Sequence, residues 1–283
     1  MKKRIFLTLF LFLLVFLLYP KSSDTISVTI KPLELIVGEI VGNSVNVNLI
    51  VPPGSSPHTF QLTIKDAVKL NKSDALIMVG AGLELWLNRV EKNFKKKQRL
   101  FKFSDYFSNF IGSGSRVNPH LWLSSKRVIK IIPELVKFLI KIYPENKAIF
   151  EKNSKNLIKE IEETDKYIEL KLNKIRNKKV VMYHPVWAYF LQDYKIKSIA
   201  TIERKPGESP SPKWVVEIIK KIKGEKVKVI IGEPNVSDKW VKMIAEATGA
   251  NVVILDPLGF SKKIKKYYEL IKFNADLLMG SLQ

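Results

Sequence analysis

The chain has 283 residues, 46% of them hydrophobic, which is enough to bury the core of one large or two ordinary domains. It contains no cysteine, so disulfides and thiolate metal ligands are excluded and any metal must be held by nitrogen and oxygen. The formal charge of +21 suggests nucleic acid, but the lysines lie in amphipathic patterns such as VVEIIKKIKGEKVKVII and no nucleic-acid motif is present. We therefore predict a globular protein without a nucleic-acid partner.

Residues 1–22 have the layout of a secretory signal. Lys2, Lys3 and Arg4 precede an apolar stretch over residues 5–19. That stretch is short of the roughly 20 residues that span a bilayer, and LLYPKSSD lacks a small-x-small cleavage pattern. The segment is thus either a cleaved signal peptide or an N-terminal anchor. Both alternatives predict a periplasmic or otherwise extracytoplasmic protein.

Residues 23–144 alternate between predicted strands and helices. Residues 26–30, 45–51 and 75–79 have the β-branched and apolar character of strands, and residues 64–70 have helical spacing. Alternating β and α elements favour a mostly parallel sheet covered by helices. This part of the chain is predicted to form an N-terminal lobe.

Residues 145–177 are predicted to form one long helix. The stretch PENKAIFEKNSKNLIKEIEETDKYIELKLNKIRNKK contains no glycine and no proline after Pro144, which is well placed for the first turn. About thirty helical residues span roughly 45 Å. A rod of this length between two lobes is expected to resist wide hinge opening.

Residues 178–283 repeat the alternating pattern in a C-terminal lobe. Strands are predicted at residues 179–183, 198–202, 227–231 and 251–255, with helices at 213–222 and 240–248. The predicted fold class is therefore α/β, with two Rossmann-like lobes of mostly parallel sheets joined by one long backbone helix.

Only three histidines are present, and each stands beside a proline at a break in the chain. His58 lies in VPPGSSPHTF, His120 in VNPHLWL and His184 in VVMYHPVW, directly after a predicted strand. A histidine in a turn is often no more than a surface residue. However, open α/β sheets bind ligands beyond the carboxyl ends of their strands, and neutral imidazoles gathered there favour a divalent cation.

Asp256, in VVILDPLG, is the candidate fourth ligand, because this carboxylate also ends an apolar strand and also precedes a proline. The alternative is an Asp-Pro pair that only begins a turn. Three nitrogens and one carboxylate suit Zn²⁺, whereas Mn²⁺ prefers more oxygens. A closed shell of four protein ligands holds a metal but leaves no position for catalysis, and the chain has no HExxH motif.

These motifs resemble the zinc and manganese binding proteins of ABC importers, known as the metal-binding adhesin or cluster A-I family. The similarity extends from about residue 26 to the C-terminus. It is carried by VPPGSSPHTF, LNKSDALIMVGAGLELWL, NPHLWL, PENKAIFEKN, YHPVWAYFLQDY, ESPSP, VKVIIGEPNVS and VVILDPLG.

The resemblance implies that His58 and His120 from the first lobe, and His184 and Asp256 from the second, bind a metal in the cleft between two metal-binding lobes. An imidazole at position 184, where manganese members tend to have a carboxylate, favours zinc. Two features depart from the zinc members: residues 103–117 contain no histidine, and Pro57 stands where some members have a ligating glutamate. Asp256 or water is then left as fourth ligand, with Glu203 and Glu208 as further carboxylates nearby.

The predicted function is capture of a divalent metal ion and its delivery to an ABC permease in the membrane, with zinc as the favoured ion and a manganese receptor of the same family as the alternative. The protein is expected to be a monomer and not an enzyme. Because only deprotonated imidazole coordinates a metal, affinity is expected to fall below about pH 6.5. Two rival hypotheses are an extracytoplasmic zinc hydrolase, in which Asp256 would act as base, and a surface adhesin, which is compatible with metal capture.

Overall fold

The structure is a computed structural model that describes residues 24–88, 99–114, 117–204, 207–234 and 239–283. The predicted signal peptide or anchor lies outside the described residues. Within the described ranges, no helix is long and apolar enough to cross a membrane.

The first lobe is built around a four-stranded parallel sheet. Its regular elements are β1 (Thr25–Val28), α2 (Lys31–Val41), β2 (Asn46–Leu49), α3 (Ile64–Lys72), β3 (Ala75–Met78), β4 (Leu100–Lys102) and α5 (Ser125–Ile142). The strand order is β2-β1-β3-β4, and every neighbouring pair is parallel. All four residues of β3 are buried, as expected for a central strand with both faces covered.

The second lobe repeats this topology. Its regular elements are β5 (Lys179–Met182), α7 (Ala188–Asp193), β6 (Lys197–Thr201), α8 (Pro212–Glu225), β7 (Val229–Gly232), α9 (Lys239–Thr248), β8 (Asn251–Ile254) and α10 (Tyr267–Leu282). The order β6-β5-β7-β8 is again all parallel. In each sheet, the chain leaves the first strand in sequence (β1 or β5) toward one edge of the sheet and leaves the third (β3 or β7) toward the opposite edge. This places a switch point, the usual ligand-binding crevice of such sheets, between β1 and β3 and between β5 and β7.

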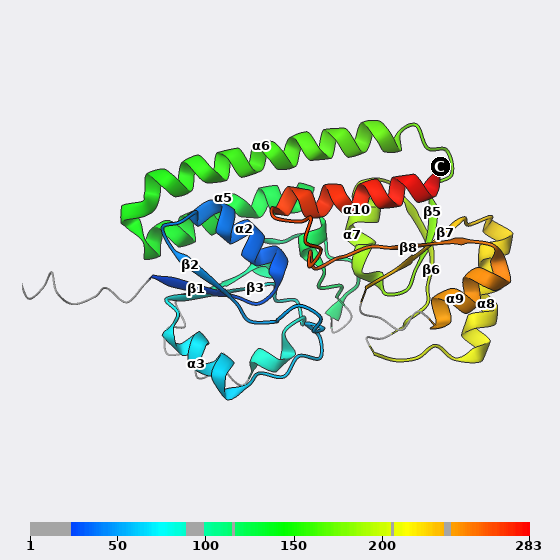
Figure 1. Ribbon diagram of the computed structural model, residues 1–283, viewed down its shortest axis with the longest axis horizontal. Helices are drawn as coiled ribbons and strands as arrows, with labels where there is room; N and C mark the ends of the chain where they lie inside the picture. The colour runs from blue at the N-terminus through cyan, green and yellow to red at the C-terminus, as the bar shows by residue number, and fades with distance from the viewer. Residues whose placement is uncertain (1–23, 89–98, 115–116, 205–206, 235–238) are drawn as a thin grey trace, which may run out of the picture.

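Helix α6 (Lys147–Leu172) runs along both lobes (Figure 1). Its 26 residues correspond to about 39 Å at 1.5 Å per residue. It packs against α5 and α2 of the first lobe and against the C-terminal helix α10. Its buried apolar side chains recur at intervals of seven and four residues, whereas the apolar Ile149 and Leu170 are exposed. The buried apolar residues are Phe150, Leu157, Ile161, Ile168 and Leu172.

One continuous core joins the two lobes. Buried apolar side chains of β1 and β3 connect through α5, α6 and α10 to those of β5 and β7. Two smaller clusters cover the remaining sheet faces, one beside α3 and one beside α8 and α9. Since moving the lobes apart would expose part of the shared core, burial of apolar surface itself opposes wide opening.

The predicted fold class is confirmed, and the strands predicted at seven positions correspond to β1, β2, β3, β5, β6, β7 and β8. Five regular elements were not predicted: α2, β4, α5, α7 and α10. Helix α10 matters most for the site, because the buried Asn274 on it holds the backbone of Asp256. Its side-chain oxygen accepts from the Asp256 N–H at 2.7 Å, and its amide nitrogen donates to the Asp256 carbonyl at 2.9 Å.

Candidate metal centre

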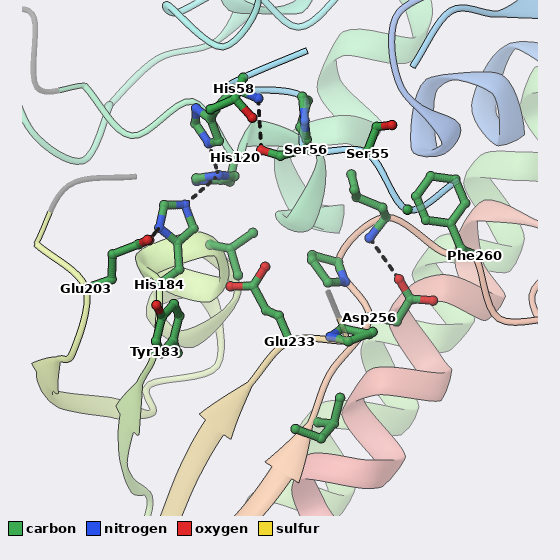
Figure 2. A pocket seen from close by; sticks show the side chains of 18 of the residues that line it. Ser55, Ser56, His58, His120, Tyr183, His184, Glu203, Glu233, Asp256 and Phe260 are labelled. Atoms are coloured by element: carbon green, nitrogen blue, oxygen red, sulfur yellow. Dashed lines mark hydrogen bonds and ion pairs between the residues drawn. The ribbon is translucent and has the colours of Figure 1, made fainter. Parts of the chain in front are cut away.

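A cavity of about 810 Å³ lies where the loops of the two lobes meet. His58 and His120 reach it from loops that follow β2 and β4 in the first lobe, and His184, Glu203, Glu233 and Asp256 reach it from the ends of β5, β6, β7 and β8. Figure 2 shows the three imidazoles gathered on one side of this cavity. All four strands of the second sheet therefore end in a residue that could ligate a metal.

The three histidines form a compact cluster. The Nε2 atom of His120 lies 3.1 Å from Nε2 of His58 and 3.2 Å from Nε2 of His184. Each of the three offers one ligand atom within 4.8 Å of the other two, and this is the group of potential metal ligands found in the described part of the chain. Two ligands of a tetrahedral Zn²⁺ with Zn–N bonds of about 2.0–2.1 Å stand about 3.3 Å apart. The observed separations are thus close to those of a zinc site.

Asn118 fixes the orientation of the buried His120. The Asn118 Oδ1 atom accepts hydrogen bonds from the backbone N–H of His120 at 3.0 Å and from its ring Nδ1 at 2.7 Å. The Asn118 amide nitrogen donates to the carbonyl of Pro185 at 2.7 Å, which settles the orientation of the side-chain amide. Because an amide oxygen can only accept, the proton of His120 is on Nδ1 and the lone pair of Nε2 faces the cluster.

Glu203 plays the same part for His184. Its Oε2 atom lies 2.7 Å from Nδ1 of His184, and the two side chains are only 8% and 10% exposed. The other carboxylate oxygen accepts from the backbone N–H of Gly207 at 2.7 Å, which fixes the carboxylate in turn. A carboxylate behind a histidine is the usual partner of a metal-bound imidazole, because it holds the tautomer whose Nε2 is free to ligate.

The Nε2 atoms of His120 and His184 thus face each other 3.2 Å apart. When both rings carry their proton on Nδ1, two lone pairs meet at this distance and repel unless a positively charged group lies between them. A divalent cation satisfies both nitrogens at once, as well as that of His58. This arrangement is the strongest chemical sign of a metal site in the described structure.

Burial lowers the pKa of His58 to about 4, and the neighbouring His184 adds to this effect while Glu203 opposes it. Burial also lowers the pKa of His120 well below its usual value, with smaller contributions from the other two histidines. Both imidazoles therefore remain neutral, and able to ligate, at pH values well below 6.5. The sequence predicts a loss of metal affinity below about pH 6.5, and the lowered pKa values of these two histidines move that expectation to more acidic conditions.

Asp256 lines the same cavity but is not brought into the histidine cluster. Its Oδ1 atom accepts from the backbone N–H groups of Leu258 at 3.2 Å and Gly259 at 2.8 Å, and its Oδ2 atom from that of Ser261 at 2.9 Å. The carboxylate thus organises its own loop, as an Asp-Pro turn does. Its role as a metal ligand stays a prediction.

Glu233 was missed by the sequence reasoning. It follows β7, and in the view of Figure 2 it lies between the histidines and Asp256 with its carboxylate directed into the cavity. Its Oε1 atom is shielded from solvent and has no hydrogen-bond partner among the residues that the structure describes. Burial raises the pKa of Glu233 to about 7, with Glu203 acting in the same direction and His184 opposing it. The signal was available in VKVIIGEPNVS, where this glutamate ends an apolar strand just before a proline.

Hydrogen bonds across the cleft hold the His120 segment to the second lobe. Besides the contact of Asn118 with Pro185, the hydroxyl of Tyr189 donates to the carbonyl of Asn118 at 2.8 Å. The indole N–H of Trp122 donates to the carbonyl of Pro257 at 2.8 Å. His120 and His184 are therefore held close together by contacts of the fold itself.

The loop that bears His58 is held more loosely. The described contacts that anchor it include the hydrogen bond from the indole N–H of Trp86 to the carbonyl of Pro57 at 2.9 Å, a long bond of 3.3 Å from the His58 N–H to Ser56, and the edge contact of the Phe60 ring with Trp86. Residues 52–54 of this loop are exposed. His58 is thus the histidine whose position depends least on the rest of the fold.

Known proteins with similar sequences are metal-binding proteins. The zinc-binding protein AdcA of Streptococcus pyogenes is 26% identical over 279 residues, which cover 88% of this chain and 54% of that protein. The chain thus spans about half the length of the AdcA relatives it matches. A protein of Thermotoga maritima described as a candidate metal-binding protein is 28% identical over 260 residues, covering 92% of this chain and 93% of that one.

Solved structures of metal-binding proteins share the fold of this chain. A crystal structure of ZnuA has a TM-score of 0.81 and 26% identity, and the match covers 92% of this chain and all of that one. A manganese-bound periplasmic metal-binding protein from Candidatus Liberibacter asiaticus has a TM-score of 0.84 at 24% identity, with the same coverage.

A family model described as the periplasmic component A of the zinc-uptake complex, ZnuA, matches residues 26–280. This match covers nearly the whole described chain and includes all the cavity residues discussed above. The resemblance to metal-binding proteins of ABC importers inferred from the sequence motifs is thereby confirmed. The chain belongs to the ZnuA family of periplasmic zinc-uptake components, within the zinc and manganese binding proteins.

Proposed function

We propose that this protein captures one divalent metal ion outside the cytoplasm, zinc in preference to manganese, and delivers it as a monomer to an ABC permease in the membrane. The observation that carries the proposal is the convergence of three imidazole nitrogens, with Nε2 of His120 3.1 Å from that of His58 and 3.2 Å from that of His184. Membership of the zinc-uptake family supports both the cargo and the partner. The function is binding and release, not catalysis.

In this proposal His58, His120 and His184 bind the ion through Nε2. Three nitrogen ligands favour Zn²⁺ over Mn²⁺, which prefers oxygen and more than four ligands. Asp256 is the candidate for the carboxylate that closes the shell. To reach the ion it would have to turn away from the backbone N–H groups of its own loop.

Release follows from the unequal anchoring of the three histidines. The permease would not need to separate the lobes, which the shared core and α6 oppose. Displacing the loop that bears His58 would remove one of the three nitrogens and open the site to water. His120 and His184 would keep their positions, ready for the next ion.

Calorimetric titration of the metal-free protein with Zn²⁺ tests the proposal. We expect one high-affinity ion per chain and a loss of at least a hundredfold in affinity in His120→Ala, because the central nitrogen of the cluster is removed. A stoichiometry other than one, or unchanged affinity in that variant, would show that the cluster is not the cargo site. The same titration with Mn²⁺ measures the preference between the two metals.

A manganese receptor is the second candidate. The observation in its favour is the number of carboxylates around the cavity, since Glu203, Glu233 and Asp256 all line it and Mn²⁺ prefers oxygen ligands. Some structures with the same fold were solved with Mn²⁺ bound. Tighter binding of Mn²⁺ than of Zn²⁺ in the titration would select this alternative.

A further inference from the structure

We propose that Glu233 is a ligand of the captured ion, in addition to the three histidines. This inference rests on the proposed function, because it concerns the composition of the same metal shell. The first observation concerns one oxygen atom of the Glu233 carboxylate. The Oε1 atom of Glu233 is buried without a hydrogen-bond partner in the described part of the chain, an arrangement that is rare in folded proteins and calls for a specific explanation.

The position of Glu233 in the sheet gives the first argument. β5 and β7 are neighbours and form the switch point of the second sheet. His184 follows β5 and Glu233 follows β7, so the two side chains stand at the carboxyl ends of adjacent strands. This is where open parallel sheets bind their ligands. Glu233 and His184 therefore line the same cavity from neighbouring strands.

A comparison with Glu84 gives the second argument. Glu84 follows β3 beside the equivalent switch point of the first sheet and is 2% exposed. Its carboxylate accepts from Thr29 Oγ1 at 2.7 Å and from the N–H groups of Val79 and Gly80, each at 2.9 Å. The first lobe thus satisfies its buried carboxylate internally. Among the described residues, the second lobe leaves one oxygen of Glu233 unsatisfied, in the cavity that the three histidines line.

A comparison with Asp256 gives the third argument. Both oxygens of Asp256 accept backbone N–H groups, so ligating a metal would cost existing hydrogen bonds. The Oε1 atom of Glu233 has no such bond to lose. Glu233 lies outside the group whose ligand atoms are within 4.8 Å of one another, so its carboxylate must move toward the histidines when the ion arrives. Rotation of its flexible side chain can supply this movement.

The ion would in turn supply a partner for the Oε1 atom of Glu233. A cation beside Oε1 compensates the buried carboxylate, and the carboxylate compensates part of the charge of an ion otherwise held by neutral nitrogens. An added oxygen ligand also makes the site more acceptable to Mn²⁺. Glu233 is thereby a residue that sets metal preference as well as affinity.

The test compares wild-type protein with Glu233→Gln, and with Glu217→Gln as a matched control. Glu217 is exposed on α8 of the same lobe, so the control removes the same charge far from the cavity. Zn²⁺ and Mn²⁺ affinities are measured by competition with a chromophoric chelator. The visible spectrum of bound Co²⁺ reports the ligand set, and the melting temperature of the metal-free proteins reports folding.

For Glu233→Gln we expect at least a tenfold loss of Zn²⁺ affinity, a larger loss for Mn²⁺, and a changed Co²⁺ spectrum. The metal-free variant should melt no lower than wild type, because the substitution breaks no described hydrogen bond of the buried Oε1 atom. This combination separates a ligand from a merely structural residue, whose removal would lower the melting temperature. The control should match wild type in every measurement.

Wild-type affinity and an unchanged Co²⁺ spectrum in Glu233→Gln would overturn the inference. A weaker affinity with an unchanged spectrum would do so too, because it would indicate only a distant effect of charge. Failure of the proposed function has a different signature. In that case the wild-type protein itself would bind no Zn²⁺, or would bind it equally well without His120.

Discussion

Removal of the carboxylate of Glu203 is expected to weaken metal binding although this residue need not touch the ion. Glu203 accepts hydrogen bonds from Nδ1 of His184 and from the N–H of Gly207, each at 2.7 Å, in surroundings from which water is largely excluded. Loss of such a partner behind a metal-bound histidine typically costs about 10- to 100-fold in affinity, or about 1.4 to 2.7 kcal/mol.

Two substitutions separate the contributions of Glu203. Glu203→Ala removes both hydrogen bonds and frees the His184 ring, so we expect a loss near the upper end of that range. Glu203→Gln keeps an oxygen that accepts a hydrogen bond but removes the charge, and we expect a loss of about tenfold. Zn²⁺ affinity is measured by chelator competition at fixed pH and salt, with Glu217→Gln as the control.

The refuting result is an affinity of Glu203→Ala within twofold of wild type. This would mean that His184 is positioned without its carboxylate, or that it is not a ligand. Because the alanine variant leaves a buried N–H of His184 unsatisfied, its metal-free form should also lose about 1–3 kcal/mol of stability. Melting curves recorded without metal show whether the variant is folded at the temperature of the titration.

Three further predictions concern the His58 loop, pH and the lobes. Trp86→Phe removes the hydrogen bond that anchors Pro57, so Zn²⁺ should dissociate about fivefold faster in stopped-flow chelation, which is equivalent to about 1 kcal/mol. The control Trp240→Phe, on α9, should leave the dissociation rate unchanged. Above pH 6.5 His58 is neutral both in the folded and in the unfolded chain. Between about pH 6.5 and 4 only the unfolded chain takes up the proton. Acidification should therefore lower the free energy of unfolding of the metal-free protein by up to about 3 kcal/mol. Thermal melts from pH 7.5 to 5 should show a weaker pH dependence in His58→Gln, and an equal dependence would contradict the lowered pKa. Small-angle scattering should show almost the same radius of gyration with and without Zn²⁺, because the shared core and α6 oppose opening of the lobes. A large compaction on addition of Zn²⁺ would contradict this expectation.

Much of the fold could be predicted from the sequence because the strands are short apolar runs bounded by turn formers. The elements that were missed have weaker local signals. β4 has only three residues, and Pro133 lies inside the pattern of α5. α10 packs on α6 and α2, and therefore depends on contacts with residues more than a hundred positions away. Such contacts leave no periodic signal of their own at short range.

The three histidines of the site could be found from sequence because they are rare and each adjoins a proline. The carboxylates could not be ranked in the same way. Asp256 and Glu233 both end a strand before a proline, and only the structure shows that the oxygens of one accept N–H groups of its own loop while an oxygen of the other has no partner. Glu203 resembles neither in its local sequence. Its contact with His184 arises from the pairing of β5 with β6, which the sequence around Glu203 does not reveal.

The most direct test of the account is anomalous X-ray diffraction from crystals of the protein grown with Zn²⁺. We expect one strong zinc peak in the cavity between the lobes, with Nε2 of His58, His120 and His184 each about 2.0–2.1 Å from the ion. A peak elsewhere on the molecule, or a zinc ion in the cavity bound by fewer than three imidazoles, would contradict the central claim that these side chains converge to hold the cargo.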